Sequence, residues 1–174
     1  MRTPLTLLAL FLLIAAVALS LTVGDSSEAA AESELSWKSF DVGASLAVQQ
    51  KKKMLVDIYT DWCGWCKKMD KEVYPDAKVK SILESKFVVV KLNAESDNKI
   101  RYQGSLISQR EFARAVGVTG YPATLFFDEN LKAITLLPGY VKADNFAQIL
   151  AFISENHYKN KSYQDYLNSL SSLK

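Results

Sequence analysis

The residues best suited to chemistry are the two cysteines, Cys63 and Cys66, which are the only cysteines in the 174-residue chain. They belong to the pentad Trp62-Cys63-Gly64-Trp65-Cys66, which follows a short apolar run. A disulfide between residues this close in sequence closes a small loop and stabilises a fold little. The spacing therefore favours redox work by a thiol pair over a purely structural disulfide.

Two other uses of paired cysteines fit the sequence poorly. A haem attachment motif needs a histidine directly after the second cysteine, where this chain has Lys67. A zinc site needs about four ligands, and His157 is the only histidine available to join the cysteines. We expect His157 to be a helix-end or surface residue, and we expect neither a metal nor an organic cofactor.

The elements around the cysteines predict different roles for the two sulfurs. Cys63 is expected where a strand over residues 54–59 ends and a helix through residues 67–73 begins. There its sulfur faces unpaired backbone N–H groups and the positive end of the helix dipole, which stabilise a thiolate. Cys66 follows one turn later and is expected to be less exposed. We predict that Cys63 attacks a substrate disulfide and that Cys66 resolves the mixed disulfide.

Each of two buried-looking strands carries one charged residue. Asp57 lies in the middle of the strand over 54–59, and Lys91 lies near the end of a strand over 87–92. A buried carboxylate is costly unless it is paired or has a task, and desolvation raises its pKa. One hypothesis is that Asp57 takes the proton from Cys66 during resolution. The other is a structural ion pair between Asp57 and Lys91.

Pro122 opens a strand predicted over 123–127, a position where proline is tolerated. It is either an ordinary start-of-strand proline or a cis proline that brings the backbone of Tyr121 beside the thiols, where it can pair with an extended substrate. Trp62, Trp65 and Tyr121 are expected to form an apolar rim around the sulfurs, with ordinary aromatic packing as the alternative.

The order of the remaining elements predicts an α/β fold. Helices are expected over 44–53, 67–73, 77–85, 108–115, 145–156 and from Ser162 to 173, and strands over 54–59, 87–92, 123–127 and 133–137. The run Lys51-Lys52-Lys53 is expected to be a solvated helix end. Residues 94–107 are predicted to be irregular. Ser108 and Glu111 are expected to form a capping box, and Asp144 and Ser162 to cap their helices. Helical crossovers and a hairpin together predict a mixed sheet of four or five strands flanked by helices.

The first 31 residues differ from the rest of the chain. Arg2 precedes a stretch over 5–23 that carries no charge and only three polar residues. This pattern predicts an export signal or, because about 20 apolar residues suffice to span a bilayer, a retained membrane anchor, in either case followed by a tether. The domain is expected over 37–157, with a C-terminal helical extension over 158–174.

The charge of the chain argues against a nucleic-acid partner. The net charge is +2, and 20 basic and 17 acidic residues remain when the first 31 residues are set aside. This excess of positive charge is too weak to imply a nucleic-acid surface. The sequence shows no internal repeat, and we expect a monomer.

Taken together, these segments resemble the thioredoxin superfamily over about residues 37–157. The matching stretches are Val-Asp-Ile-Tyr-Thr-Asp-Trp-Cys-Gly-Trp-Cys-Lys over 56–67, Val-Lys-Leu-Asn over 90–93, Gly-Val-Thr-Gly-Tyr-Pro-Ala-Thr over 117–124, and Gly139. The resemblance implies the thioredoxin fold, a nucleophile at Cys63 and a resolving thiol at Cys66. It also implies a buried acid at Asp57 paired with Lys91, and a cis proline at Pro122.

Within the superfamily, residues 67–76 are similar to the envelope branch typified by the C-terminal domain of the DsbD-type membrane disulfide reductase. This similarity implies an exported, periplasmic reductase whose partners are envelope proteins with thiols or disulfides and an upstream membrane electron donor. Gly64-Trp65 stands where cytosolic thioredoxins have Gly-Pro, so the redox potential is open. Residues 94–107 form a longer segment than a plain thioredoxin needs, and would be a docking loop or an inert insertion. An oxidase or isomerase, and a thioredoxin-fold chaperone or binding module without redox turnover, are the alternative functions.

Overall fold

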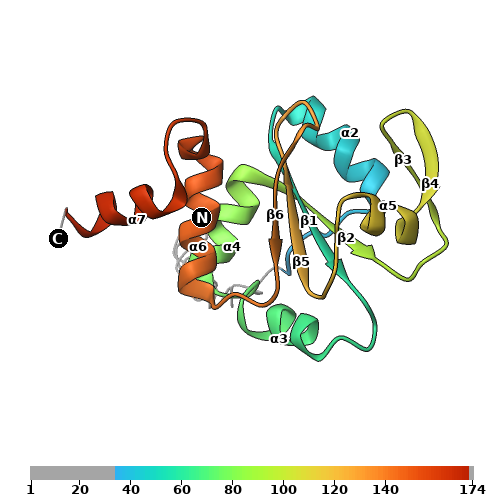
Figure 1. Cartoon of the computed structure of the whole chain (residues 1–174), viewed down its shortest axis with the longest axis horizontal. Coiled ribbons are helices and arrows are strands. Elements are labelled where there is room, and N and C mark those ends of the chain that lie inside the picture. The colour runs from blue at the N-terminus through green and yellow to red at the C-terminus, as the bar shows by residue number, and fades with distance from the viewer. Residues whose placement is uncertain (1–33, 173–174) are drawn as a thin grey trace, which may run out of the picture. The chain divides into compact units, whose positions relative to one another are not determined.

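A four-stranded mixed sheet runs through the centre of the fold (Figure 1). The structure, a computed structural model, describes residues 34–172, so the expected export signal or anchor over 1–31 lies outside the described residues. The strand order is β2-β1-β5-β6, with β1 parallel to β2 and the other neighbours antiparallel. The strands are β1 (Lys53–Tyr59), β2 (Phe87–Asn93), β5 (Ala123–Phe127) and β6 (Ala133–Pro138).

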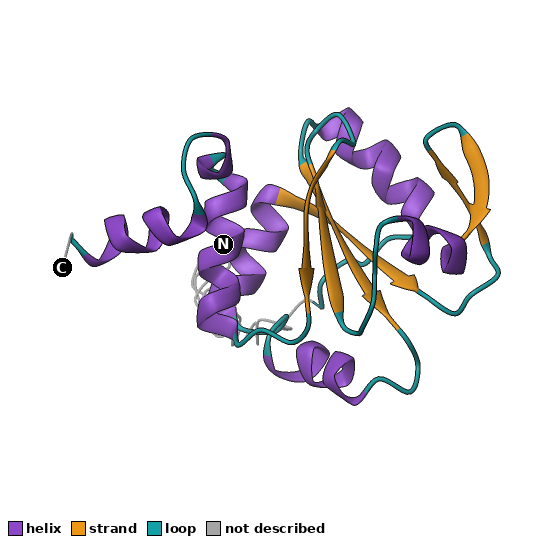
Figure 2. Ribbon diagram, viewed as in Figure 1, coloured by secondary structure: helices purple, strands orange, loops and turns teal. Residues whose placement is uncertain are grey.

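Helices cover both faces of this sheet (Figure 2). They are α2 (Phe40–Gln50), α3 (Gly64–Glu72), α4 (Ala77–Lys86), α5 (Gln109–Ala115), α6 (Ala143–Ser154), the 3-10 turn η1 (His157–Lys159) and α7 (Tyr163–Ser171). The helices α4 and α6 pack together on one face, while α2 and α5 lie on the other. The predicted α/β class, the mixed sheet and the flanking helices are confirmed. Within residues 34–172, no helix combines the length and apolar character needed to cross a membrane.

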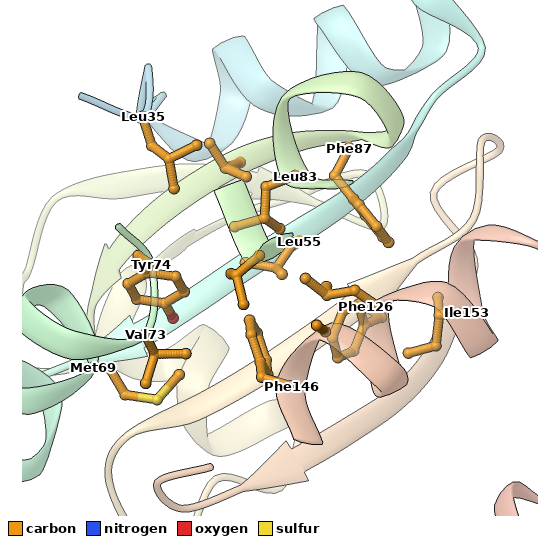
Figure 3. Close-up of a cluster of buried hydrophobic side chains, with 14 of the residues drawn as sticks. Leu35, Leu55, Met69, Val73, Tyr74, Leu83, Phe87, Phe126, Phe146 and Ile153 are labelled. Atoms are coloured by element: carbon orange, nitrogen blue, oxygen red, sulfur yellow. The ribbon is translucent and has the colours of Figure 1, made fainter. Parts of the chain in front are cut away.

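The core is divided into two clusters by the sheet, and β1 contributes to both. Leu55 packs with Phe126 and Phe146 on the face covered by α4 and α6 (Figure 3). Its neighbours in sequence, Met54 and Val56, point to the opposite face. A strand buried on both faces explains why β1 has an almost continuous apolar sequence. It also explains why a charged residue within β1 needs a partner.

The prediction of an irregular segment over 94–107 is wrong. This region contains a two-stranded antiparallel hairpin, β3 (Lys99–Tyr102) and β4 (Ser105–Ser108). Its turn residues Gln103 and Gly104 both have positive φ, at 48° and 83°, as a tight two-residue turn requires. Ile100 of β3 is buried in the cluster beneath α2 and α5. The strands are short, and Tyr102 and Ile100 are their main apolar anchors, which made the alternation easy to miss.

The predicted first residues of two helices, α2 and α6, are wrong. Helix α2 begins at Phe40 rather than 44 and continues through Gly43, where an added Cβ would lie 2.2 Å from Val90 Cγ2. The glycine therefore permits the helix to pack closely on β2. Helix α6 begins at Ala143 with Lys142 at the N-cap position, so Asp144 lies in the first turn and does not cap the helix.

The lysine run is not simply a solvated helix end. Lys51 adopts a left-handed conformation (φ 52°) and ends α2, whereas Lys53 is the first residue of β1. Lys53 is only 7% exposed, and its Nζ lies 3.4 Å from a carboxylate oxygen of Glu129. The prediction failed for Lys53 because a helix C-terminus and the start of the next strand share the same lysine-rich stretch.

The capping predictions at the other helices agree with the structure. Ser108 and Glu111 form the predicted capping box at α5, with hydrogen bonds in both directions. Ser162 accepts a hydrogen bond from the backbone N–H of Asp165 at the start of α7. Tyr166 of α7 packs against Phe152 of α6 with 5.3 Å between ring centres, so α7 contacts the body of the fold.

Candidate active site

The two cysteines form a disulfide at the start of α3. Cys63 occupies the N-cap position of the helix, just beyond the carboxyl end of β1, and is bonded to Cys66 with 5.3 Å between their Cα atoms. The backbone N–H of Cys66 donates a hydrogen bond to Cys63 Sγ over 3.0 Å. A helix N-terminus and a backbone donor both favour negative charge on this sulfur once the disulfide is reduced.

The expected difference in exposure between the cysteines is very small. Cys63 is 3% exposed and Cys66 is 2% exposed in the disulfide form. Burial of the whole residue therefore does not distinguish the attacking sulfur. The helix position does, because Cys63 Sγ receives the backbone N–H at the helix start.

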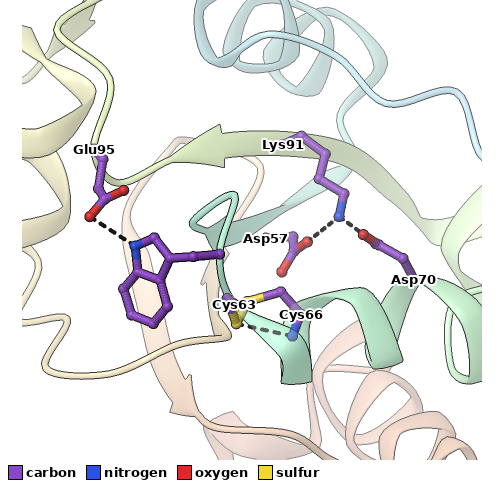
Figure 4. The surroundings of a disulfide bond; sticks show 7 residues. Asp57, Cys63, Cys66, Asp70, Lys91 and Glu95 are labelled. Carbon is purple, nitrogen blue, oxygen red and sulfur yellow. Dashed lines mark hydrogen bonds and ion pairs between the residues drawn. A yellow bond between two sulfur atoms is a disulfide. The ribbon is translucent and has the colours of Figure 1, made fainter.

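Asp57 lies behind the disulfide as a buried member of an ion-paired group (Figure 4). Its Oδ2 is 2.6 Å from Lys91 Nζ, and the side chain of Asp57 is only 1% exposed. The register of the sheet accounts for the pair, because Asp57 and Lys91 are directly opposite on the parallel strands β1 and β2. Lys91 also forms an ion pair with Asp70 of α3, whose side chain is 48% exposed. One lysine thus links a buried carboxylate to one that reaches solvent.

Burial and charge act in opposite directions on this group. Burial raises the pKa of Asp57 above its ordinary value, and the attraction of Lys91 only partly opposes this rise. For Lys91, burial lowers the pKa, but the carboxylates of Asp57 and Asp70 outweigh burial and leave it raised. Asp57 is therefore a carboxyl group that holds a proton more readily than an exposed one does, beside a lysine that stays charged.

Two hydroxyl groups share the buried surroundings of Asp57. Thr124 lies opposite Asp57 on β5, and its side chain is fully buried. Tyr74, just after α3, is 3% exposed. Burial raises the pKa of Tyr74 well above its usual value, and the nearby Asp57 carboxylate raises it further. Tyr74 is therefore a neutral hydroxyl beside the acid.

Pro122 follows a cis peptide bond, so of the two alternatives the cis proline is present. It directly precedes β5, whose partner on one side is β1, the strand that leads to the disulfide. The carbonyl oxygen of Pro122 accepts a hydrogen bond of 2.8 Å from the backbone N–H of Gly139. This bond joins the Tyr121 loop to the segment that follows β6.

Two aromatic pairs surround the disulfide. Trp62 is 67% exposed, packs edge-on against Tyr121 with 6.0 Å between ring centres, and donates from Nε1 to a carboxylate oxygen of Glu95 over 3.0 Å. Trp65 is 56% exposed and packs against Tyr140 at 5.1 Å. The exposure of both tryptophans contradicts ordinary core packing as their explanation and agrees with the expected rim.

A lysine and a glutamate lie beside the Trp65–Tyr140 pair. Lys68 Nζ lies 5.2 Å from the ring centre of Trp65 and 5.4 Å from that of Tyr140. Glu72 is 3.8 Å from the same amine and accepts a hydrogen bond from the Tyr140 hydroxyl over 3.3 Å. The Trp65 side of the rim thus carries an ion pair of Lys68 and Glu72 beside its aromatic rings, whereas the Trp62 side carries the acceptor Glu95.

Sequence reasoning missed several residues of this site. Asp70 belongs to a helix rich in charges, and nothing in its position reveals that it faces Lys91. Tyr140 and Glu95 come from segments that reach the disulfide only after the chain has folded. His157, in contrast, lies at the start of η1 beside Glu155, at 3.0 Å from its carboxylate oxygen. Among the described residues, no three histidine, cysteine or acidic side chains group as a metal site.

Comparison with known families identifies the fold and the chemistry together. The family model described as a thioredoxin-like domain matches residues 40–154. The chain belongs to this thioredoxin-like family. Curated relatives named "Thiol:disulfide interchange protein DsbD" include proteins from Actinobacillus pleuropneumoniae, 30% identical over 103 residues, and from Pseudoalteromonas atlantica, 29% identical over 136 residues. The matches cover 58% and 71% of this chain but only 16% and 21% of those relatives.

Solved structures agree on the fold of this DsbD-like member of the thioredoxin superfamily. A thioredoxin-fold protein from Helicobacter pylori has a TM-score of 0.58 at 22% identity, with 71% of this chain and 82% of that chain covered. A thioredoxin from Thermus thermophilus has the same score and identity, with 70% and 88% covered. The family and the Cys63–Cys66 pair together support thiol–disulfide oxidoreductase activity for this chain.

Proposed function

We propose that the chain reduces disulfide bonds in envelope proteins, by cycling its cysteine pair between dithiol and disulfide. The observation that carries this proposal is the position of the Cys63 sulfur at the N-terminus of α3. There it is bonded to the Cys66 sulfur and accepts a hydrogen bond from the backbone N–H of Cys66. The direction of electron flow rests on the similarity to DsbD-type reductases.

The proposed reaction has two exchange steps. The Cys63 thiolate attacks one sulfur of the substrate disulfide, forming a mixed disulfide and releasing the first substrate thiolate. Asp57 then takes the proton of Cys66, and the Cys66 thiolate attacks Cys63 Sγ. The second substrate thiolate leaves, and both released thiolates take up protons. The substrate gains two electrons and two protons, while the chain is left with the Cys63–Cys66 disulfide.

The exposed rim supports recognition of extended protein segments. Trp62 and Trp65 flank the disulfide and together with Tyr121 offer apolar surface to a client. Tyr121, held by the cis peptide bond to Pro122, precedes β5 and offers its backbone groups for pairing with an extended client, as in strand addition. We propose that these four residues bind the client while Cys63 reacts.

An insulin-reduction assay tests the catalytic proposal. Wild type should reduce insulin with dithiothreitol as electron source, and Cys63→Ser should abolish turnover. No turnover by wild type, or full turnover by Cys63→Ser, would defeat the proposal. Binding of an unfolded chain without turnover would instead favour the chaperone or binding module, for which the two exposed tryptophans are the specific observation.

The direction of electron flow is tested by the equilibrium of the cysteine pair with glutathione. Thioredoxin-like pairs span roughly −270 to −120 mV. A potential near the reducing end supports a reductase that receives electrons from a membrane donor. A value near the oxidising end would replace it with an oxidase or isomerase.

We also propose that the domain over 37–157 is exported by its N-terminal segment over 1–31, which serves as a signal or an anchor. The domain is then expected to act as a monomer in the periplasm or at the extracytoplasmic face of the membrane. An alkaline phosphatase fused to the C-terminus should be active only if the domain is exported. A phosphatase that stays inactive, although the fusion accumulates, would contradict export. N-terminal sequencing and a carbonate wash of the membranes then distinguish cleavage from anchoring.

A further inference from the structure

Three aromatic rings enclose the ammonium group of Lys91. Its Nζ lies 4.8 Å from the ring centre of Trp37, 5.2 Å from that of Tyr59 and 5.3 Å from that of Tyr74. All three distances are within the roughly 6 Å range of an attractive cation–π contact. The rings come from three separate segments, so the enclosure exists only in the folded chain.

Trp37 belongs to a short segment that precedes α2 and lies outside the residues matched by the family model. This segment pairs with the edge strand β2, where the backbone N–H of Lys38 donates to the carbonyl oxygen of Val89 over 2.9 Å. The backbone N–H of Lys91 donates in turn to the carbonyl oxygen of Lys38 over 3.2 Å. Trp37 also packs edge-on against Tyr74 at 4.9 Å. The indole is therefore held in place by both its backbone and its neighbour.

We propose that Trp37 is a positioning residue that holds Lys91 against Asp57, and that the segment before α2 is thus a working part of the redox domain. The effect of this Lys91 placement on the resolution of the mixed disulfide rests on the proposed function, in which Asp57 is the base. The placement itself is a property of the folded protein that can be measured without any substrate.

Lys91 has alternatives to Asp57, which is why a positioning residue matters. Its side chain is 22% exposed, and Asp70 offers a second, more exposed carboxylate. The charged or titratable groups that face Lys91 are Asp57 and Tyr59 from β1, Asp70 from α3, and Tyr74 after α3. Without the indole, the ammonium group can turn toward Asp70 and water.

Loss of the Trp37 indole is expected to change the pKa of Asp57, because the burial of Asp57 does not depend on Lys91 alone. Asp57 lies in the central strand β1, between β2 and β5, and is 1% exposed. Burial raises its pKa, and Lys91 is the main influence that lowers it. If Lys91 turns away while Asp57 stays buried, the pKa of Asp57 rises and less of the base is ionised at a given pH.

The direct test is an NMR titration of the Asp57 carboxyl carbon in the reduced full chain, purified in a mild detergent. Trp37→Leu keeps an apolar side chain, although a smaller one, but removes the aromatic face, and should increase the proton affinity of Asp57 by about threefold to tenfold. Trp37→Phe keeps a ring and should lie between wild type and Trp37→Leu. The pH profile of mixed-disulfide resolution should move to higher pH by the same amount.

The Lys91→Met background separates positioning from packing. With no ammonium group to hold, Trp37→Leu should leave the Asp57 titration unchanged. An unchanged titration of Trp37→Leu in the wild-type background, or an equal shift in the Lys91→Met background, would overturn the proposal. If Trp37→Leu does not fold, Trp37→Phe carries the same comparison, with a smaller upward shift expected and no shift counting against it. A shifted titration with unchanged resolution would refute the role of Asp57 as base while leaving the positioning intact.

Discussion

Replacing Asp57 with asparagine should stabilise the fold at neutral pH, although it breaks an ion pair. Asp57 is 1% exposed, so its charge is almost entirely desolvated in the folded state. Asparagine has nearly the same shape without the charge. Lys91 would keep Asp70 as its partner and remains 22% exposed, so the substitution leaves no isolated buried charge. Loss of the desolvation cost should therefore outweigh loss of the pair.

The size of this gain in stability depends on pH. Replacement of a buried ion pair by uncharged groups is often neutral or stabilises a protein by up to about 4 kcal/mol, whereas removal of one partner destabilises it when a buried charge is left unpaired. Because Asp70 and solvent accommodate Lys91, we expect a gain of about 1 to 4 kcal/mol at neutral pH. Burial raises the folded-state pKa of Asp57 above its ordinary value of 3.8, so the folded state binds this proton more tightly than the unfolded state does. The stability contributed by Asp57 is thus fully present below the ordinary value and is lost as pH rises through the folded-state pKa. Asp57→Asn should match wild type near pH 3 and exceed it increasingly toward neutral pH.

Urea unfolding of the oxidised protein, followed by circular dichroism from about pH 3 to pH 9, measures this difference. Asp144→Asn is the matched control, because its carboxylate is 85% exposed and lies 3.7 Å from Lys78. Loss of that exposed pair should change the free energy of unfolding by less than about 1 kcal/mol. A stability gain of Asp57→Asn that does not vary with pH, or a loss at pH 7, would refute the reasoning.

Three further substitutions test the site and the fold. Cys66→Ser should keep the first attack but accumulate a mixed disulfide on Cys63, detected as a covalent adduct by mass spectrometry; absence of the adduct would contradict the assigned order of attack. Gly43→Ala should lower the free energy of unfolding by about 1 to 3 kcal/mol, since the new Cβ would lie 2.2 Å from Val90 Cγ2. Helix propensity alone predicts the opposite, because alanine favours a helix more than glycine does. A variant as stable as wild type or more stable would therefore contradict the close packing. Ser108→Ala should lower the free energy of unfolding, measured with denaturant, by about 1 kcal/mol because the capping box of α5 is lost. Ser108→Thr keeps a hydroxyl and should retain most of the wild-type stability. Equal stabilities of the two variants would contradict the cap.

The parts of the fold that sequence predicted well are those with strong local signals. The apolar runs of β1 and β2, the capping box at Ser108 and the paired cysteines each need only a few neighbouring residues to be recognised. Asp57 was conspicuous for the same reason, because a charge within an apolar run departs from its local pattern. Lys91 could be suggested as its partner once two parallel strands were expected side by side.

The parts that sequence did not predict depend on packing between distant segments. Asp70 and Trp37 both contact Lys91, although they lie more than 30 residues apart in the chain. Trp37 lies in no recognisable motif, and the similarity of residues 67–76 to the envelope branch does not reveal that Asp70 faces Lys91. The β3–β4 hairpin has only four residues in each strand, so its alternation is weak. Lys53 was misplaced because its register opposite Phe87 puts it in β1, and the lysine-rich run does not reveal where the helix ends and the strand begins.

The disulfide lies at the boundary between two environments that the fold keeps separate. On its exposed side are Trp62 and Trp65, which come from the loop and first turn that follow β1 and are more than half exposed. On its buried side is Asp57, within the central strand and almost without solvent contact. The rim proposed to bind a client and the carboxylate proposed to take the proton therefore lie in different environments. Substitutions in the exposed rim should alter client binding while the burial that raises the pKa of Asp57 is unchanged.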